Sequence, residues 1–154
     1  MKRAPSTTVR DLANRKAVIA SSDATLRECA QVMRDEHVGS VVVVDRKAKW
    51  RPVGVITDRD IVVEAVAVGL DPATLTAGDV AATPVTTVRE DEDILDALAR
   101  MREGGVRRLP VVDAEDQLSG IVTLDDLLQA LAEQLDSVAR VISAERTKES
   151  VTRG

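Results

Sequence analysis

The chain has 154 residues, a formal net charge of −5 and a single cysteine. This length fits one domain or two closely packed halves, and one cysteine excludes an internal disulfide. The acidic balance argues against the concentrated basic surface of nucleic-acid binders. We see no leading signal peptide and no apolar run long enough to span a bilayer, so we expect a cytoplasmic protein that binds neither nucleic acid nor membrane.

The sequence repeats itself. An offset of 68 positions aligns Met33 with Met101, and after two extra residues within 46–52 an offset of 66 aligns Gly54 with Gly120. Two copies of this length indicate two similar subdomains in one pseudo-symmetric module, not a solenoid. We assign the first copy to residues 8–70, the second to residues 76–135, and a helical tail to residues 136–154.

The first copy opens with a helical turn in which Thr8 caps the helix and Asp11 answers at the third position. A strand, an amphipathic helix, two strands that form a hairpin and a second helix follow. We expect these elements at residues 17–20, from Thr25, at residues 40–45 and 53–56, and from Thr57 to Gly69.

The second copy repeats this order. Its opening turn begins at Thr76, and its other elements are expected at residues 85–88, after Asp93, at residues 108–113 and 118–122, and from Thr123. Strands that alternate with helices in each copy indicate sheets covered by helices, an α/β (α+β) fold.

Each copy contains Gly, two apolar residues, Thr, two further residues and Asp where the last strand meets the helix. Unpaired backbone N–H groups at a helix N-terminus favour phosphate, and a carboxylate, which accepts hydrogen bonds, suits the two ribose hydroxyls. Thr57 with Asp60, and Thr123 with Asp126, therefore predict nucleotide sites. The same spacing is an ordinary helix cap, and duplication copies a cap just as faithfully, so this alternative stays open.

The two copies, each with a Val-Val-Asp strand followed by this signature, resemble the CBS domain pair, or Bateman module. The resemblance covers roughly residues 8–135, and residues 57–62 and 69–72 are similar to stand-alone bacterial CBS proteins of the hypoxic response protein type. It implies two tandem β-α-β-β-α subdomains, packed sheet to sheet with pseudo-two-fold symmetry. It also implies two clefts that bind adenosine nucleotides, each combining one copy's signature with residues of the other copy.

Carried over residue by residue, the resemblance implies two pockets. The first would comprise Val55, Thr57, Arg59, Asp60, Val85, Val106 and Arg107, with Arg108 near the phosphates. The second would comprise Val18, Val38, Gly39, Ile121, Thr123, Asp125 and Asp126.

These two pockets are predicted to be unequal. Arg59 precedes the aspartate of the first signature, whereas Asp125 precedes that of the second, and Arg107 and Arg108 align with uncharged residues of the first copy. An opposite charge about 4 Å away contributes about 4 kcal/mol at an effective dielectric near 20. We therefore expect the first pocket to bind a phosphorylated ligand more tightly, unless these arginines only face solvent or pair with neighbouring carboxylates.

Four other features carry narrower expectations. His37 has no ligand cluster at metal spacing, so a capping or surface role is expected and no metal. Cys29 lies on an apolar helix face and belongs in the core, while Trp50 is either an oligomer contact or part of a loop packed by cation–π contacts. The apolar spacing that continues to Ile142 predicts a homodimer through the tail, or else a helix that closes its own core.

Together these patterns predict a regulatory or sensor module that binds an adenosine nucleotide, AMP first and ATP or ADP next. Catalysis is disfavoured, because no nucleophile or metal set accompanies Asp60 and Asp126. The alternatives are a structural or dimerisation module without ligand, and a module that binds NAD or S-adenosylmethionine. Binding would bias dimer geometry or association with an unidentified protein partner.

Overall fold

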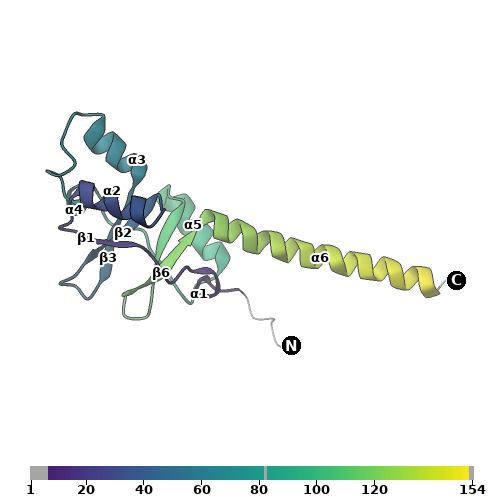
Figure 1. The fold of residues 1–154 in the computed structure, drawn as a ribbon. Helices are drawn as coiled ribbons and strands as arrows, with labels where there is room; N and C mark the ends of the chain where they lie inside the picture. Colours follow the sequence, from purple (N-terminus) through teal and green to yellow (C-terminus); the bar gives the residue numbers. More distant parts are fainter. Residues whose placement is uncertain (1–6, 82, 153–154) are drawn as a thin grey trace.

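A computed structural model describes residues 7–81 and 83–152 of the chain, with side chains described to residue 146. The first repeat forms α1 (Val9–Leu12), β1 (Ile19–Ser21), α2 (Leu26–Asp35), β2 (Ser40–Asp45), β3 (Arg51–Thr57), α3 (Asp58–Ile61) and the π-helical η1 (Val62–Val66). The second forms α4 (Ala77–Val80), β4 (Val88–Arg89), α5 (Ile94–Gly104), β5 (Arg108–Val112), β6 (Leu118–Thr123) and α6 (Leu124–Thr152) (Figure 1). The α/β class and the order of elements confirm the expectation from sequence.

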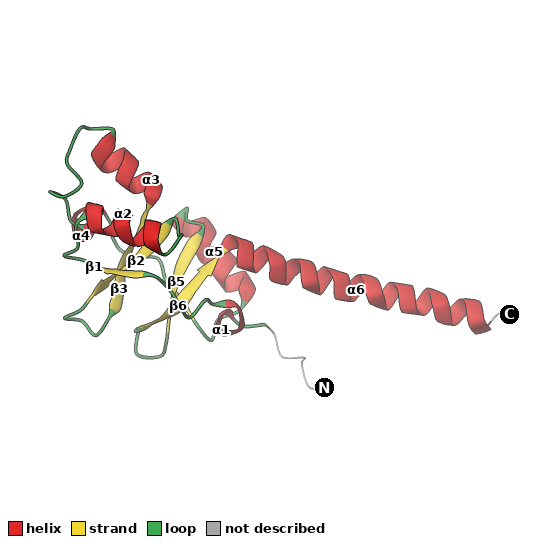
Figure 2. Ribbon diagram, viewed as in Figure 1, coloured by secondary structure: helices red, strands yellow, loops and turns green. Residues whose placement is uncertain are grey.

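The strands form two separate three-stranded sheets, β1-β2-β3 and β4-β5-β6 (Figure 2). In each sheet the first strand runs parallel to the middle one and the hairpin is antiparallel. The register places Thr57 opposite Ser40 and Thr123 opposite Arg108, so each signature threonine lies beside the first residue of a middle strand. We call the unit around β1–β3 the first half and the unit around β4–β6 the second half.

The first strand of each sheet begins later than the sequence pattern suggested. β1 starts at Ile19 and β4 at Val88, whereas we expected residues 17–20 and 85–88. The residues just before these strands line hollows of the surface instead of pairing fully with the middle strand. The apolar pattern identified both segments correctly, but it did not show which of their residues would pair with the middle strand.

The two apolar cores exchange their opening helical turns. The first core, around Leu26, Val43 and Ile56, includes Ala77 and Ala81 from the α4 segment of the second repeat. The second core, around Leu109 and Leu127, includes Val9 of α1 from the first repeat. The packing therefore crosses the boundary between the sequence repeats.

The signature glycines are the points at which this exchange is tightest. A Cβ at Gly54 would lie 2.4 Å from the Cβ of Ala81, and one at Gly120 would lie 2.9 Å from the carbonyl oxygen of Asn14. Asn14 also exchanges two backbone hydrogen bonds with Ile121, at 2.9 and 3.0 Å. Glycine is required here because the backbone of one repeat passes directly over the sheet of the other.

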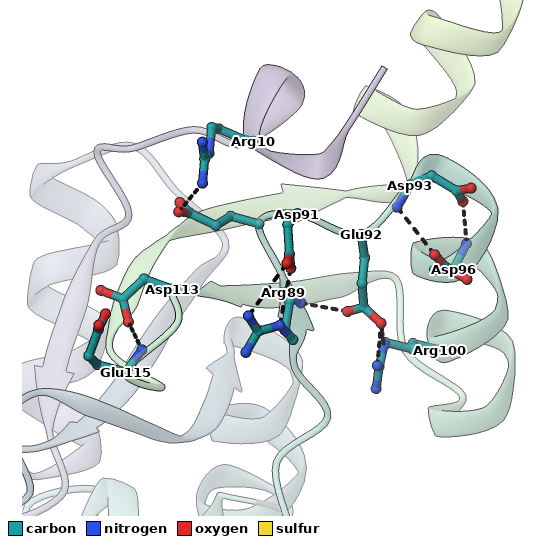
Figure 3. A network of polar contacts seen from close by, with 10 residues as sticks. Arg10, Arg89, Asp91, Glu92, Asp93, Asp96, Arg100, Asp113 and Glu115 are labelled. Carbon is teal, nitrogen blue, oxygen red and sulfur yellow. Dashed lines mark hydrogen bonds and ion pairs between the residues drawn. The ribbon is translucent and has the colours of Figure 1, made fainter. Parts of the chain in front are cut away.

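Polar contacts hold α1 on the second half (Figure 3). The Arg10 guanidinium pairs with Glu90 at 2.5 Å, and the backbone N–H of Val9 donates to the carbonyl of Glu92 at 2.9 Å. The Glu92 carboxylate in turn accepts from Arg100 Nε at 3.1 Å. This network fixes the first turn of one repeat against the loop before α5 of the other.

The structure shows the surroundings of Cys29, His37 and Trp50, the three single residues considered in the sequence analysis. Cys29 is fully buried, and burial raises the pKa of its thiol. His37 is exposed just after α2 with a left-handed φ of 54°, the position that Gly105 holds after α5. The Arg46 guanidinium lies 5.7 Å from the centre of the Trp50 ring, as the cation–π interpretation predicted, although 49% of the Trp50 residue stays exposed.

Helix α6 begins on the second core and then extends away from both sheets (Figure 1). Leu127 and Ala130 are buried, whereas Leu135, Val138 and Ile142 are exposed. Closing its own core therefore accounts only for the first part of this helix. None of the described helices is both long and apolar enough to cross a membrane.

We predict that Gly54→Ala lowers the free energy of unfolding by about 1–3 kcal/mol, because the added methyl group overlaps Ala81. Urea unfolding followed by circular dichroism measures this. The matched test is Gly54→Ala with Ala81→Gly, which removes the opposing methyl group and should restore part of the loss. Unchanged stability of Gly54→Ala would show that the two segments are not in contact.

The structure also predicts acid sensitivity. Hydrogen bonds from the backbone and the hydroxyl of the capping threonines lower the pKa of Asp11, Glu28 and Asp79 below their ordinary values of 3.8, 4.5 and 3.8. The unfolded chain then binds protons first, so these groups stabilise the fold above their ordinary pKa values and lose that effect as pH falls below them.

Asp79→Asn isolates one of these groups. The difference in stability between wild type and Asp79→Asn, measured by urea unfolding from pH 7 to pH 3, should shrink as the aspartate becomes protonated. A difference that stays constant over this range would contradict the assigned cap.

Candidate functional site

A cavity of about 460 Å³, which we call cavity 1, lies between the two halves. The first half contributes the end of β3 and the start of α3. The second half contributes the segment before β4 and the junction of α5 with β5. Its lining residues are Val55, Thr57, Arg59, Asp60, Pro84, Val85, Thr86, Gly104, Gly105, Val106, Arg107 and Arg108. Every residue that we predicted for the first pocket lies in this wall.

Thr57 and Asp60 are fixed by each other. The Asp60 Oδ2 atom accepts hydrogen bonds from the Thr57 backbone N–H at 2.7 Å and from its hydroxyl at 2.8 Å, while the Asp60 N–H donates back to Thr57 Oγ1 at 3.1 Å. Among the described residues, Asp60 Oδ1 has no hydrogen-bond partner. The pair is therefore a helix cap that leaves one carboxylate oxygen free at cavity 1.

The expectation of unpaired backbone N–H groups at this turn is wrong for α3. The N–H of Asp58 donates to the carbonyl of Gly39 at 3.1 Å, and the N–H of Arg59 donates to the side chain of Asp58 at 2.8 Å. The N–H of Asp60, the third in this turn, donates to the Thr57 hydroxyl oxygen. The first turn of α3 therefore has no free backbone donor for an anion. Positive charge at cavity 1 has to come from side chains.

Three arginines supply that charge. Arg59, Arg107 and Arg108 are exposed, and in the part of the chain that the structure describes none of them forms an ion pair. They are therefore not paired with neighbouring carboxylates, the alternative left open by the sequence. Three guanidinium groups beside an open cavity, with Asp60 as the acidic residue in the same wall, favour an anionic ligand.

The rest of the wall is apolar and closely fitted. Val55, Pro84, Val85 and Val106 provide hydrocarbon surface. Gly104 is needed where α5 meets the segment before β4, since a Cβ there would lie 2.8 Å from the Thr86 hydroxyl oxygen. Such a surface is suited to a flat apolar group such as a nucleobase.

A second hollow, cavity 2, has a volume of about 240 Å³ and lies at the pseudo-equivalent place. Its lining residues are Asn14, Lys16, Ala17, Val18, Val38, Gly39, Ser40, Arg108, Ile121 and Thr123. Five of the seven residues predicted for the second pocket are among them. Asp125 and Asp126 are not, although Asp126 caps α6 through Thr123 as Asp60 caps α3.

Asp125 lines a separate hollow of about 180 Å³ together with Arg107, Arg108, Thr123 and Leu124. Asp125 therefore lies beside cavity 2 and not in its wall, and weaker binding of a phosphorylated ligand in the second pocket stays a prediction. Cavity 2 instead carries Lys16 and Arg108. The difference between the cavities lies in volume and in the presence of Asp60 in cavity 1, while both walls contain cations.

Four residues that sequence reasoning missed, Pro84 and Thr86 of cavity 1 and Lys16 and Ala17 of cavity 2, follow from the repeat, because they neighbour or align with the predicted Val85 and Val18. The 68-residue offset aligns Pro84, Val85 and Thr86 of cavity 1 with Lys16, Ala17 and Val18 of cavity 2. Applying this offset to the whole segment, and not to single apolar positions, would have predicted both sets. The two glycines at the end of α5 carried no such signal, because they align with Glu36 and His37.

Comparison with known proteins identifies the family. The model of the CBS domain matches residues 9–66 and again residues 77–133. A Mycobacterium tuberculosis protein, Hypoxic response protein 1, is 38% identical over 127 residues, which cover 82% of this chain and 87% of that protein. The uncharacterized protein MK0525 of Methanopyrus kandleri is 41% identical over 124 residues, covering 80% of this chain but only 62% of that relative.

Solved structures of CBS domain proteins share this fold. A crystal structure of Hypoxic Response Protein I with two coordinated zinc ions has a TM-score of 0.71 and 37% identity, over 80% of this chain and 98% of that one. The CBS domain pair of protein MJ0100, in complex with 5′-methylthioadenosine and S-adenosyl-L-methionine, has a TM-score of 0.72 and 26% identity, over 84% and 99%.

The described residues contain no group of three or more His, Cys, Asp or Glu side chains placed to hold a metal ion. The expectation that the protein needs no metal stays a prediction. Two matches to the family model, covering most of the chain, coincide with the two sequence repeats. The chain therefore belongs to the CBS domain family, as a CBS domain pair, the regulatory module that the sequence resembled.

Proposed function

We propose that this CBS domain pair is a sensor that binds an adenosine nucleotide in cavity 1, with AMP as the first candidate and ATP or ADP next. The observation that carries this proposal is the combination in one wall of a half-free carboxylate at Asp60, an apolar surface and three unpaired guanidinium groups. The volume of about 460 Å³ lies in the range of small-molecule sites.

Each part of the ligand has a matching group. Asp60 Oδ1 accepts hydrogen bonds from the ribose hydroxyls, while Oδ2 stays in the cap with Thr57. The base lies against Val55, Val85 and Val106. The phosphate meets guanidinium groups instead of backbone N–H groups, because those at the start of α3 are already used.

Cavity 2 is proposed as the weaker site. It is roughly half the size, and the Asp126 carboxylate that would meet a ribose does not line it. Its cations, Lys16 and Arg108, still attract an anion, so the difference between the sites concerns recognition of the sugar more than net charge.

A second candidate ligand class is an adenosyl compound without phosphates. The MJ0100 domain pair is solved with 5′-methylthioadenosine and S-adenosyl-L-methionine, which share the adenosine part with AMP. NAD remains a further alternative, as does a module that only dimerises. The three guanidinium groups at cavity 1 favour the phosphorylated ligands over these.

The proposed output is regulatory. Binding between the two halves biases their relative arrangement, and through it a homodimer or an unidentified protein partner, provided that the ligand distinguishes the two states. We propose a cytoplasmic protein that performs no catalysis, requires no metal and binds neither nucleic acid nor membrane. The exposed apolar residues of α6 support the homodimer.

The first test compares two aspartates that cap their helices in the same way. By isothermal titration with AMP, Asp60→Ala should weaken binding roughly ten- to a hundredfold, the loss of a charged hydrogen bond, while Asp126→Ala should change it little. Because both substitutions remove an equivalent cap, Asp126→Ala controls for the structural cost. Equal losses in the two variants would remove the assignment to cavity 1.

The second test separates phosphate from nucleoside recognition. Arg107→Ala should weaken AMP binding about tenfold and leave binding of adenosine unchanged, because only AMP carries the charge that this arginine meets. Arg102→Ala, an exposed arginine of α5 outside the cavity walls, is the matched control. If Arg107→Ala weakened both ligands alike, the arginine would not be reading the phosphate.

A further inference from the structure

One arginine lines both cavities. Among the described residues, Arg108 is the residue that the walls of cavity 1 and cavity 2 have in common. Arg108 also lines the hollow of about 180 Å³ beside Asp125, together with Arg107. It therefore lies where the three hollows approach one another.

The pseudo-symmetry of the repeats assigns Arg108 to only one of these walls. Arg108 begins β5 and pairs with Thr123, just as Ser40 begins β2 and pairs with Thr57. Ser40 lines cavity 2 but not cavity 1, although its partner Thr57 lines cavity 1. The equivalent Arg108 lines cavity 1 and, in addition, the cavity of its own partner Thr123. The greater length of the arginine side chain accounts for this additional contact.

The other cations of the two walls are not shared between them. Arg59 and Arg107 line cavity 1, and Lys16 lines cavity 2. Arg108 is exposed, and in the described part of the chain it forms no ion pair. Its guanidinium group is thus available to a phosphate in either cavity.

We propose that Arg108 binds the phosphate in whichever cavity is filled first, so that a phosphorylated ligand in one cavity weakens binding of a second one in the other. This inference rests on the proposed function and adds a coupling between its two sites. A guanidinium group carries one positive charge, whereas a phosphate monoester carries about −1.5 to −2 charges at pH 7. One arginine cannot neutralise two such groups. The second ligand therefore enters a cavity whose shared cation is already engaged and whose neighbour holds a like charge.

The cations that are not shared set the order of filling. When Arg108 is engaged elsewhere, cavity 1 still has Arg59 and Arg107, while Lys16 is the remaining described cation of cavity 2. The first ligand therefore enters cavity 1, and cavity 2 fills at a higher concentration than its own groups require. By thermodynamic reciprocity, a ligand in cavity 2 weakens cavity 1 by the same factor. A neutral nucleoside brings no charge to Arg108 and is not coupled in this way.

The first experiment closes one cavity at a time. The 68-residue offset aligns Ala17 of cavity 2 with Val85 of cavity 1, so Ala17→Trp and Val85→Trp fill aligned places with the same side chain. By isothermal titration with AMP, Arg108→Ala should weaken binding about tenfold in both occluded chains. Arg59→Ala should weaken it only in Ala17→Trp, where cavity 1 is open. An effect of Arg108→Ala in only one occluded chain, or in neither, overturns the proposal.

The second experiment measures the coupling itself. In Val85→Trp, where cavity 1 is closed, cavity 2 should bind AMP about tenfold more tightly than in the second binding step of wild type, where cavity 1 is already filled. With adenosine the two values should agree, which controls for any distortion that the tryptophan causes. Adding Arg108→Ala to both chains should reduce the difference seen with AMP. Equal AMP affinities in Val85→Trp and in the second step of wild type overturn the proposal.

Failure of the coupling is distinguishable from failure of the nucleotide sites. If each occluded chain binds AMP as tightly as the corresponding step of wild type, the sites stand and the coupling falls. If neither wild type nor the occluded chains bind AMP, the proposed function falls and the coupling with it. Circular dichroism verifies that each variant is folded. Ala17→Phe and Val85→Phe, with a smaller side chain, repeat the comparison where a tryptophan variant does not fold.

Discussion

The close packing of each signature glycine against the opposite repeat is the contact on which the rest of the molecule depends. Ala81 lies over Gly54, and Asn14 lies over Gly120 while it pairs with Ile121. Through these contacts each opening helical turn joins the core of the other half. The two halves are thereby held at a fixed spacing, and cavity 1 is the space left between β3 with α3 on one side and the end of α5 on the other. Gly54 and Gly120 thus allow the two halves to pack closely, and the position of cavity 1 follows from that packing.

The Thr-x-x-Asp spacing has a structural role wherever it occurs. The carboxylate three residues later, an aspartate or in one case Glu28, accepts a hydrogen bond from the threonine N–H at Thr8, Thr25, Thr57, Thr76 and Thr123. The cap therefore cannot by itself identify a ligand site. What distinguishes Thr57 with Asp60 is their place in the wall of cavity 1, beside three unpaired arginines. The two interpretations of the signature are compatible, because one carboxylate oxygen closes the cap and the other remains available.

Much of the fold could be predicted from the sequence, since the repeat, the caps and the apolar spacing are local signals. Most of the wall of cavity 1 could be predicted from the resemblance to the CBS domain pair. Its residues belong either to the Gly-to-Asp signature of the first copy or to segments of the second copy that the family motif also marks. The place of Asp125 could not, because one residue along a first helical turn rotates a side chain by about 100° and moves it into another hollow. Nor could the N–H groups of α3 be assigned in advance, because Asp58 uses its own side chain to satisfy that of Arg59.

The central claim is that an adenosine nucleotide binds in cavity 1 and is oriented there by Asp60. A crystal structure of the protein grown with AMP tests it most directly. The account predicts density for one nucleotide between the halves, with a ribose hydroxyl within hydrogen-bond distance of Asp60 Oδ1 and the phosphate beside Arg59, Arg107 or Arg108. AMP bound elsewhere with cavity 1 empty, or bound there with its ribose turned away from Asp60, would contradict it.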